Sequence, residues 1–367
     1  MIILLVGIVL FLISIIRKKS YNPYIGFLLP LIIMGFQSGV EGDYMEYMDS
    51  FNSGDMGYTV KELEFAWIAI NQLFQPFGFH SMVFFISLFQ ILICAYYVKN
   101  YVSSGKQWMG AIIFFFTFAC MLIQMKAMRQ GVAMECAMLA FILAEKRLYI
   151  PSIIFGILSF GFHNSALIIL WILIVYIIII NISKANIFKR FFKQLDRINN
   201  SRNFVYITLF LMLLFCYFKM SIFNTYLIPL ALSSEDLSYQ GYLESLGDNQ
   251  LSLWLLVSFF IKGYLFSSLY VYDSSTRIFS LLAIISIFAN LSFFGFGNLM
   301  RLSNYFTLFT IATIPNVCKM LEEKYIHKGI IYSNLFFFLY MIIELRTTIP
   351  WLISADNDGF ATYEFIF

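Results

Sequence analysis

Long apolar runs separated by short polar connections constrain this sequence more than any other feature. Several of them approach the ~20 residues that a helix needs to cross the hydrocarbon core of a bilayer. Only 12% of the residues are charged, about half of the ~25% found in an ordinary soluble domain. The sequence therefore predicts an all-α, polytopic integral membrane protein with a single membrane domain over residues 1–367. Twelve transmembrane helices are expected, over 2–16, 24–40, 81–98, 108–125, 129–145, 148–162, 164–183, 203–219, 251–271, 276–294, 299–319 and 329–348.

The charged residues orient these predicted spans. Arg17, Lys18 and Lys19 follow the first run, whereas a cleavable signal peptide carries its positive charges before its apolar region, so we expect a retained span with its amino end outside. Alternating the other spans from this start places most of the 24 Lys and Arg residues on one side, and such an excess marks the cytoplasmic side. Both termini are therefore predicted outside the cytoplasm. The two runs that flank His163 form either one broken helix or two tightly connected ones.

Three predicted connections are long. Residues 184–202 are basic with interleaved Phe and Ile, which predicts a cytoplasmic helix against anionic lipid head groups rather than a contact with nucleic acid. Residues 41–80 and 220–250 are acidic and contain several tyrosines, and both are predicted to lie outside the cytoplasm.

The loop at 41–80 also carries helix-start signals. Asp43 precedes Glu46 by three residues, and Thr59 precedes Glu62 by three, which is the spacing of a capping box. Residues 60–75 then place apolar side chains on one stripe and polar ones, including Glu64, on another. This pattern predicts an interfacial helix on the outer membrane surface.

Charged groups at the edges of spans are candidate functional residues, because a charge in the hydrocarbon region is costly. The predicted topology places five such side chains on the same outer face: Asp43, Glu64, Arg129, His163 and Arg301. Lys126 lies three residues before Arg129, and Tyr305 lies four residues after Arg301, so each pair can project one way from its helix.

Each candidate also has a purely structural interpretation. Asp43 could cap the helix that begins at Tyr44, a role that is compatible with a site. Glu64 could be one more solvated carboxylate, and His163 could donate to a backbone carbonyl at a turn. The arginines and Lys126 could extend to lipid phosphates.

Two further sets of side chains are less specific. Tyrosines beside acidic groups are candidate sugar-stacking surfaces; they are Tyr44, Tyr47, Tyr58, Tyr239 and Tyr242. Three ionisable residues lie deeper within spans, and we expect one or more of them to form buried ion pairs; they are Glu135, Lys262 and Glu344.

Familiar cofactor motifs are missing from the sequence. Neither a phosphate-binding loop nor a dinucleotide fingerprint is complete, and neither GxSxG nor HExxH occurs. The five cysteines lie in apolar runs without a CxxC pair. We therefore expect no metal, nucleotide or other cofactor. Chemistry on the outer face would then need an activated substrate such as a lipid diphosphate, with cations stabilising the leaving diphosphate and a carboxylate or imidazole taking a proton.

Five segments resemble, in order, the recurring blocks of the EpsG family, which comprises Wzy-like polymerases of exopolysaccharide, capsule and O-antigen assembly. The segments are GDYMEYMDSF (42–51), ELEFAWIAINQLF (62–74), MRQGVAMECAMLAF (128–141), SFGFHNSALIIL (159–170) and MRLSNYF (300–306). The polar positions of the family fall on Asp43, Glu64, Arg129, His163 and Arg301, the same five that the predicted topology places together.

The resemblance implies a membrane glycosyltransferase of GT-C-like architecture. Its site would transfer an undecaprenyl-diphosphate-linked glycan onto a lipid-linked repeat unit, without a metal and with inversion, at the extracytoplasmic face of a bacterial plasma (inner) membrane. The implied partners are the lipid-linked donor and acceptor, membrane lipids, and a chain-length regulator and flippase of the same pathway.

The implied roles are assigned residue by residue. Arg129 and Arg301, with Lys126, would bind the donor diphosphate. His163 or Glu64 would be the base, and Asp43 would orient the acceptor or the base. Tyr44 and Tyr305 would contact sugar. A glycan ligase, a flippase and a non-catalytic scaffold remain alternatives.

Overall fold

The computed structural model describes residues 22–38, 43–54, 64–117, 119–182, 202–222, 253–293, 297–325, 327–353 and 364–365. The predicted span at 2–16, the predicted capping pair Thr59 and Glu62, and most of the loops at 184–202 and 220–250 lie outside these ranges. The chain divides into two compact units. Unit 1 is Met1–Ile182 with Thr310–Phe367, and unit 2 is Ser183–Phe309.

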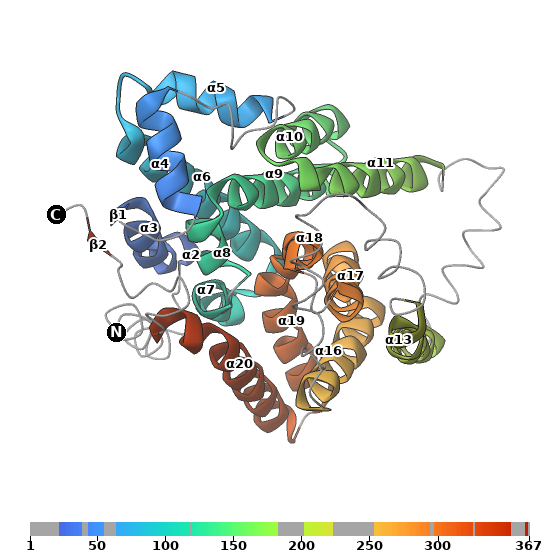
Figure 1. Cartoon of the computed structure of the whole chain (residues 1–367). Helices are drawn as coiled ribbons and strands as arrows, with labels where there is room; N and C mark the ends of the chain where they lie inside the picture. The colour runs from blue at the N-terminus through green and yellow to red at the C-terminus, as the bar shows by residue number, and fades with distance from the viewer. Residues whose placement is uncertain are drawn as a thin grey trace. The chain divides into compact units, whose positions relative to one another are not determined.

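Helices make up almost all of the described part of unit 1 (Figure 1). They are α2 (Pro23–Gly26), α3 (Leu28–Gly35), α4 (Asp43–Ser53), α5 (Phe65–Phe74), α6 (Phe79–Tyr101), η1 (Ser104–Lys106), α7 (Gln107–Phe116), α8 (Met121–Lys126), α9 (Met128–Glu145), α10 (Tyr149–Phe162), η2 (Asn164–Ala166), α11 (Leu167–Ile182), α19 (Thr310–Lys324) and α20 (Gly329–Ile353). Two short strands, β1 (Gln37–Ser38) and β2 (Glu364–Phe365), pair in antiparallel register.

The described part of unit 2 is mostly helical. Its helices are α13 (Arg202–Ile222), α16 (Leu253–Tyr272), α17 (Arg277–Phe293) and α18 (Gly297–Thr307). Hydroxyl and amide side chains join α17 to α18, because Ser286 Oγ lies 2.7 Å from Thr307 Oγ1 and Ser303 Oγ donates to Asn290 Oδ1 at 3.0 Å.

The helices agree with the predicted membrane class. Among the described residues, four are long and apolar enough to cross a membrane: Phe79–Tyr101, Asn164–Asn181, Leu255–Tyr272 and Gly329–Arg346. Shorter apolar helices cover Pro23–Gly35, Phe65–Phe74, Tyr149–Phe162, Asn203–Leu214 and Arg277–Leu291. The all-helical class is confirmed for this part of the chain, and the count of twelve crossing helices stays a prediction.

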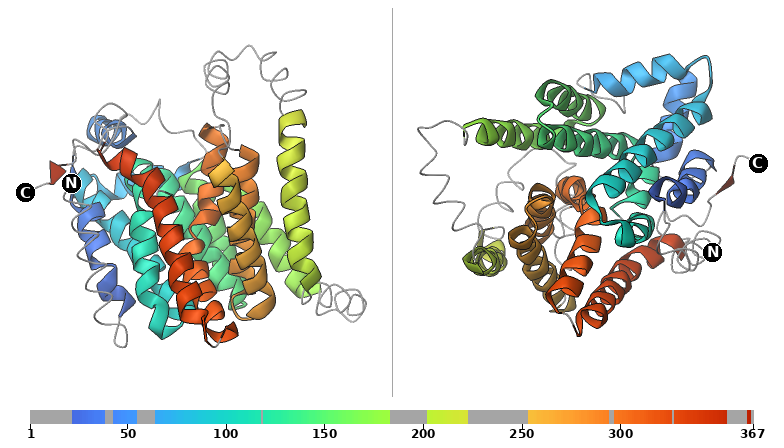
Figure 2. Two further views of the ribbon diagram at one scale, coloured as in Figure 1. Left: turned by 90° about the horizontal axis from the view of Figure 1, so that it is seen from below. Right: turned by 180° about the vertical axis from the view of Figure 1, so that it is seen from behind.

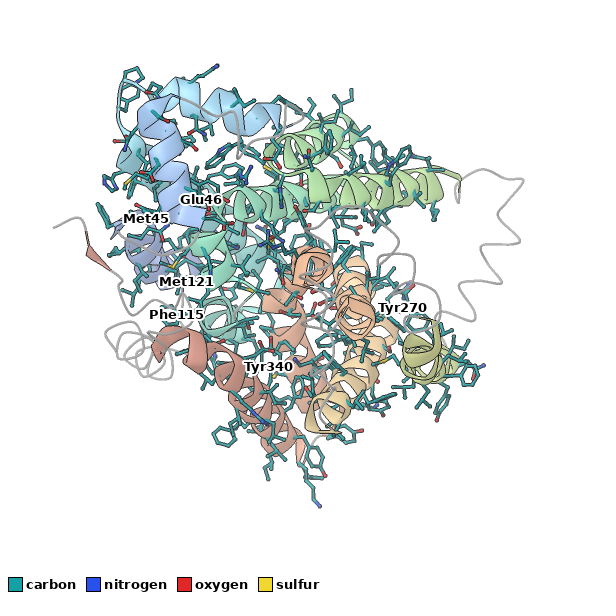
Figure 3. All side chains as sticks on the ribbon, in the orientation of Figure 1. Met45, Glu46, Phe115, Met121, Tyr270 and Tyr340 are labelled. Atoms are coloured by element: carbon teal, nitrogen blue, oxygen red, sulfur yellow. The ribbon has the colours of Figure 1, made fainter. Side chains whose placement is uncertain are left out.

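The predicted span at 108–125 is broken in the structure. The backbone turns extended at Thr117, and α8 starts only at Met121. Side chains of α20 bond to residues at this break: Thr348 Oγ1 donates to the Phe116 backbone carbonyl at 2.8 Å, and the Tyr340 hydroxyl lies 3.3 Å from the side-chain oxygen of Thr117. Figure 3 labels Tyr340 on α20. Irregular backbone at membrane depth requires such partners. They are within reach because α20 packs beside α7 and α19 in unit 1 (Figure 2).

An antiparallel hairpin of α9 and α10 forms the part of unit 1 that positions the candidate site. Ser152 Oγ donates to the Ala140 carbonyl at 2.8 Å, and Ser159 Oγ donates to the Ala133 carbonyl at 2.6 Å. Small side chains let two helix backbones approach closely. The two bonds fit one register of the antiparallel hairpin. One further helical turn in this register places the end of α10 opposite the beginning of α9.

We predict that Ser159→Leu disrupts this hairpin. Ser159 is 1% exposed, so the larger side chain has no room and should lower the free energy of unfolding by about 1–3 kcal/mol. Thermal unfolding of the purified protein in nanodiscs measures the change. Ser81→Leu is the matched control, since Ser81 is exposed and its hydroxyl donates to the Phe77 carbonyl just before the same helix instead of to another helix. Equal stability of the two variants would contradict the prediction.

Candidate active site

A single carboxylate connects two of the predicted site residues in unit 1. Glu64 precedes the first residue of α5, and its side chain is 3% exposed. Its Oε2 lies 2.5 Å from Arg129 Nη1, and its Oε1 lies 2.9 Å from His163 Nδ1. The backbone N–H of Asn164 also donates to Oε1, at 3.3 Å. Both carboxylate oxygens of Glu64 are therefore bonded within the protein.

Local backbone geometry explains how Arg129 and His163 meet. Arg129 is the second residue of α9, just after a break in helical conformation at Ala127. His163 follows the last residue of α10 and has an extended backbone. The register of the α9–α10 hairpin sets these two ends opposite each other. Their side chains are 17% and 20% exposed, so both remain partly accessible.

An aromatic residue extends this arrangement to Asp43. The Arg129 guanidinium lies 5.1 Å from the centre of the Tyr47 ring, a separation suited to a cation–π contact. The Tyr47 hydroxyl donates to Asp43 Oδ2 at 3.3 Å, and the ring packs 5.2 Å from that of Trp67. Together, Asp43, Tyr47, Glu64, Arg129 and His163 form what we call the Glu64 cluster.

The surroundings of Glu64 keep its carboxyl ionised. Burial raises the pKa of this carboxyl, but the hydrogen bond from His163, the charges of Arg129 and His163, and the Asn164 N–H together outweigh burial and hold it below its ordinary value. Burial likewise raises the pKa of the Tyr47 hydroxyl, which stays protonated and can donate to Asp43. The Glu64 cluster therefore contains a carboxylate with a low proton affinity.

This ionisation determines the tautomer of His163. An ionised carboxylate can only accept hydrogen bonds, so the His163 Nδ1 atom must carry the proton that it shares with Glu64. In a neutral ring Nε2 is then the nitrogen that can accept a proton. The sequence left His163 and Glu64 as alternative bases, and this geometry favours His163, with Glu64 orienting the imidazole.

Two other predicted site residues of unit 1 differ from expectation. Lys126 ends α8, and the break at Ala127 separates it from Arg129, so the expected spacing on one continuous helix is wrong. Tyr44 is completely buried, donates to the Gln37 carbonyl at 3.0 Å and packs against the Phe79 ring. We therefore correct its predicted sugar contact to a packing role.

The remaining predicted site residues belong to unit 2. Arg301 and Tyr305 share α18, one turn apart as predicted; Arg301 is exposed and Tyr305 is buried. Their participation in the same site as the Glu64 cluster stays a prediction. The candidate sugar-stacking residues Tyr58, Tyr239 and Tyr242 lie outside the described ranges.

Sequence reasoning understated two members of the site. Tyr47 was considered only as a sugar-stacking residue, although it lies four residues after Asp43 and so shares a helix face with it. Asn164 was overlooked because its contribution comes from the backbone. In the described part of the chain, no group of three or more His, Cys, Asp or Glu side chains is arranged to hold a metal ion.

We predict that Glu64→Gln lowers the free energy of unfolding at pH 7 by about 2 kcal/mol, because Arg129 loses a charged hydrogen-bond partner. The pKa of Glu64 is depressed in the folded protein, so its contribution exists above the ordinary glutamate pKa of about 4.3. That contribution is lost as the pH falls through the lower folded value. The difference in the free energy of unfolding between wild type and Glu64→Gln should therefore become smaller as the pH falls.

Denaturant unfolding of both proteins between pH 7 and pH 3 measures this difference. Glu46→Gln is the control, because Glu46 is an exposed carboxyl on α4 (Figure 3). A difference that is independent of pH would contradict the role assigned to the Glu64 charge.

Comparison with known proteins yields a match to one family model. No significant match was found among curated proteins or solved structures. The model of the EpsG family matches residues 20–365, which is nearly the whole chain and contains every residue of the Glu64 cluster. This family indicates a polysaccharide-polymerase-like role in a membrane. The chain belongs to the EpsG family.

Proposed function

We propose that this protein is a polysaccharide polymerase that transfers a growing undecaprenyl-diphosphate-linked glycan onto a lipid-linked repeat unit. Membership of the EpsG family supports the polymerase-like role. The observation that carries the chemistry is the 2.9 Å contact between His163 Nδ1 and the Glu64 carboxylate. Buried carboxylates that bond one imidazole nitrogen are a recurrent means of holding the other nitrogen ready as a base.

In the proposed reaction, His163 is the general base. Its Nε2 removes the proton from an acceptor sugar hydroxyl while that oxygen attacks the anomeric carbon of the donor glycan. The bond between this carbon and the lipid diphosphate breaks, and the electron pair leaves on the diphosphate. Glu64 stabilises the imidazolium that forms. A single displacement of this kind inverts the anomeric configuration and needs no metal.

Cationic side chains are proposed to stabilise the leaving diphosphate. Arg129 carries five N–H donors on a planar fork, which suits a phosphate group. Its contact with the Tyr47 ring and its bond to Glu64 hold the guanidinium in one orientation. Arg301 and Lys126 would contribute further positive charge. Asp43 would orient the acceptor or, through its hydrogen bond, Tyr47.

The setting of this reaction is also part of the proposal. The Glu64 cluster would face the extracytoplasmic side of a bacterial inner membrane, within a GT-C-like helical architecture. A chain-length regulator and a flippase of the same pathway would act as partners. The product would be an exopolysaccharide, a capsule or an O-antigen.

A glycan ligase and a lipid-linked oligosaccharide flippase are the alternatives. A ligase would use the same chemistry with a different acceptor. A flippase would place its ionisable groups near the bilayer midplane, whereas the Glu64 cluster lies at helix ends. Analysis of lipid-linked glycans in a deletion strain separates the three: single repeats outside indicate a lost polymerase, long lipid-linked chains a lost ligase, and single repeats trapped inside a lost flippase.

His163→Gln should abolish the polymer ladder while single-repeat glycans persist. Loss of a general base typically costs 10²–10⁴-fold in rate, which is enough to remove long chains. Glycans from complemented deletion strains, separated by gel electrophoresis, give the readout. His327→Gln is the matched control, since His327 is exposed. A full-length ladder from His163→Gln, at normal protein levels, would exclude His163 as the base.

Arg129→Lys should reduce chain length, and Arg129→Ala should remove the ladder. Lysine keeps the charge but cannot form the planar contacts of a guanidinium with both a carboxylate and a phosphate. Arg346→Ala, at an exposed position on α20, controls for general loss of an arginine. Equal ladders in wild type and Arg129→Ala would refute the diphosphate role.

A further inference from the structure

A second carboxylate of unit 1 lies deeper than the Glu64 cluster. Glu135, in the middle of α9, is completely buried. Its Oε1 accepts a hydrogen bond from Gln124 Nε2, on α8, and a weaker one from Cys94 Sγ, on α6, at 3.6 Å. Side chains of α6 and α8 therefore both bond to Glu135 on α9.

Several buried polar atoms at or near Glu135 have no hydrogen-bond partner among the residues that the structure describes. They are Glu135 Oε2, Gln124 Oε1 and Gln90 Nε2, and all three side chains are 1% exposed or less. Gly131 lets the Gln90 amide and the backbone at Gln124 lie close to α9, because a Cβ at position 131 would lie 2.7 Å from Gln90 Nε2 and 2.9 Å from the Gln124 Cα. Buried polar atoms are normally satisfied, so the two unpartnered oxygens, Glu135 Oε2 and Gln124 Oε1, point to a bound proton or cation.

The charges around Glu135 restrict what that species is. Within the described residues Glu135 makes no ion pair, although the sequence suggested one for this class of residue. The titratable groups that interact with it or with its neighbour Cys120 are thiols and a carboxyl, namely Cys94, Cys120, Cys136 and Glu344. An isolated buried carboxylate is strongly unfavourable, and such a group is neutralised or binds a cation.

The pattern of donors and acceptors favours a proton over a metal ion. Hard divalent cations take six or more oxygen ligands, whereas this cluster offers two unpartnered oxygens beside an amide N–H and a thiol. One proton on Glu135 Oε2 would turn that atom into a donor. The remaining unpartnered oxygen, Gln124 Oε1, belongs to the side chain that already bonds the other oxygen of Glu135.

We propose that Glu135 is a proton-binding site: a neutral carboxylic acid in a cyclic pair with the Gln124 amide. The amide Nε2 donates to Glu135 Oε1, and the acid Oε2–H donates to Gln124 Oε1. A single proton thus satisfies both oxygens and removes the buried charge. Polymerase activity is not assumed in this proposal.

The pair has a structural consequence. Gln124 lies on α8 and Glu135 on α9, so it joins the two helices across the break at Ala127. Arg129, a member of the Glu64 cluster, follows that break by two residues. The proton on Glu135 therefore helps to position the beginning of α9.

Infrared difference spectroscopy tests the proposal on the purified full-length protein in nanodiscs at pH 7. Subtracting the spectrum of Glu135→Gln from that of wild type should show the loss of one carbonyl band of a neutral carboxylic acid. Glu145→Gln is the matched control, because Glu145 ends the same helix and is exposed; that variant should leave the band of the neutral acid unchanged. Loss of a carboxylate band in Glu135→Gln, or a band that depends on sodium, would overturn the proposal.

A second variant tests the pairing and does not need Glu135 to be replaced. Gln124→Met has a similar volume but no amide, so the acid band should shift to the frequency of a carboxylic acid with a weaker hydrogen bond. Thermal stability should fall in Gln124→Met and be retained in Glu135→Gln, whose amide can form the same cyclic pair. An unshifted acid band in Gln124→Met would exclude the acid–amide pair.

Discussion

The buried carboxylate of Glu64 is the group on which the arrangement of the candidate site depends. Taking a carboxylate and a guanidinium out of water is unfavourable unless each finds good partners. Here the two oxygens meet one guanidinium, one imidazole and one backbone N–H. These partners come from two separate segments, the beginning of α9 and the junction between α10 and η2, so the side chain of Glu64 contacts groups that are far apart in the sequence.

Helix ends and helix packing make this convergence possible. Arg129 lies at the beginning of α9 and His163 at the end of α10, and the two serine bonds of the hairpin fix their common level. A helix end lets a polar side chain leave the apolar stripe without breaking the hydrogen bonds of a helix interior. Glu135 and Gln124 form a comparable polar contact in the buried interior. Their hydrogen bond joins α8 to α9 across the break at Ala127.

Much of this organisation could be predicted from the sequence, for identifiable reasons. Long apolar runs predict helices directly. Because a charge in hydrocarbon is costly, Asp43, Glu64, Arg129 and His163 could be predicted as candidate site residues, and the structure brings them together. The break at Thr117, inside the predicted span 108–125, was missed because no Pro or Gly marks it. The predicted helical relation of Lys126 to Arg129 failed because the backbone leaves the helical conformation at Ala127, between the two residues. Tyr44 was misjudged because an aromatic ring beside acidic residues does not reveal whether it faces a ligand or the core. The contact between Glu64 and His163, on which the proposed roles of both residues rest, depends on distances that only the fold supplies.

The protonation of the His163 ring tests the central claim most directly. The chain has three histidines, so nitrogen-15 NMR of histidine-labelled protein in nanodiscs gives few signals, and the spectrum of His163→Gln identifies those of His163. Our account predicts a protonated Nδ1 hydrogen-bonded to Glu64, with Nε2 unprotonated in the neutral ring. A neutral ring with the proton on Nε2 and none on Nδ1 would contradict it, because His163 could then neither donate to Glu64 through Nδ1 nor accept a proton at Nε2.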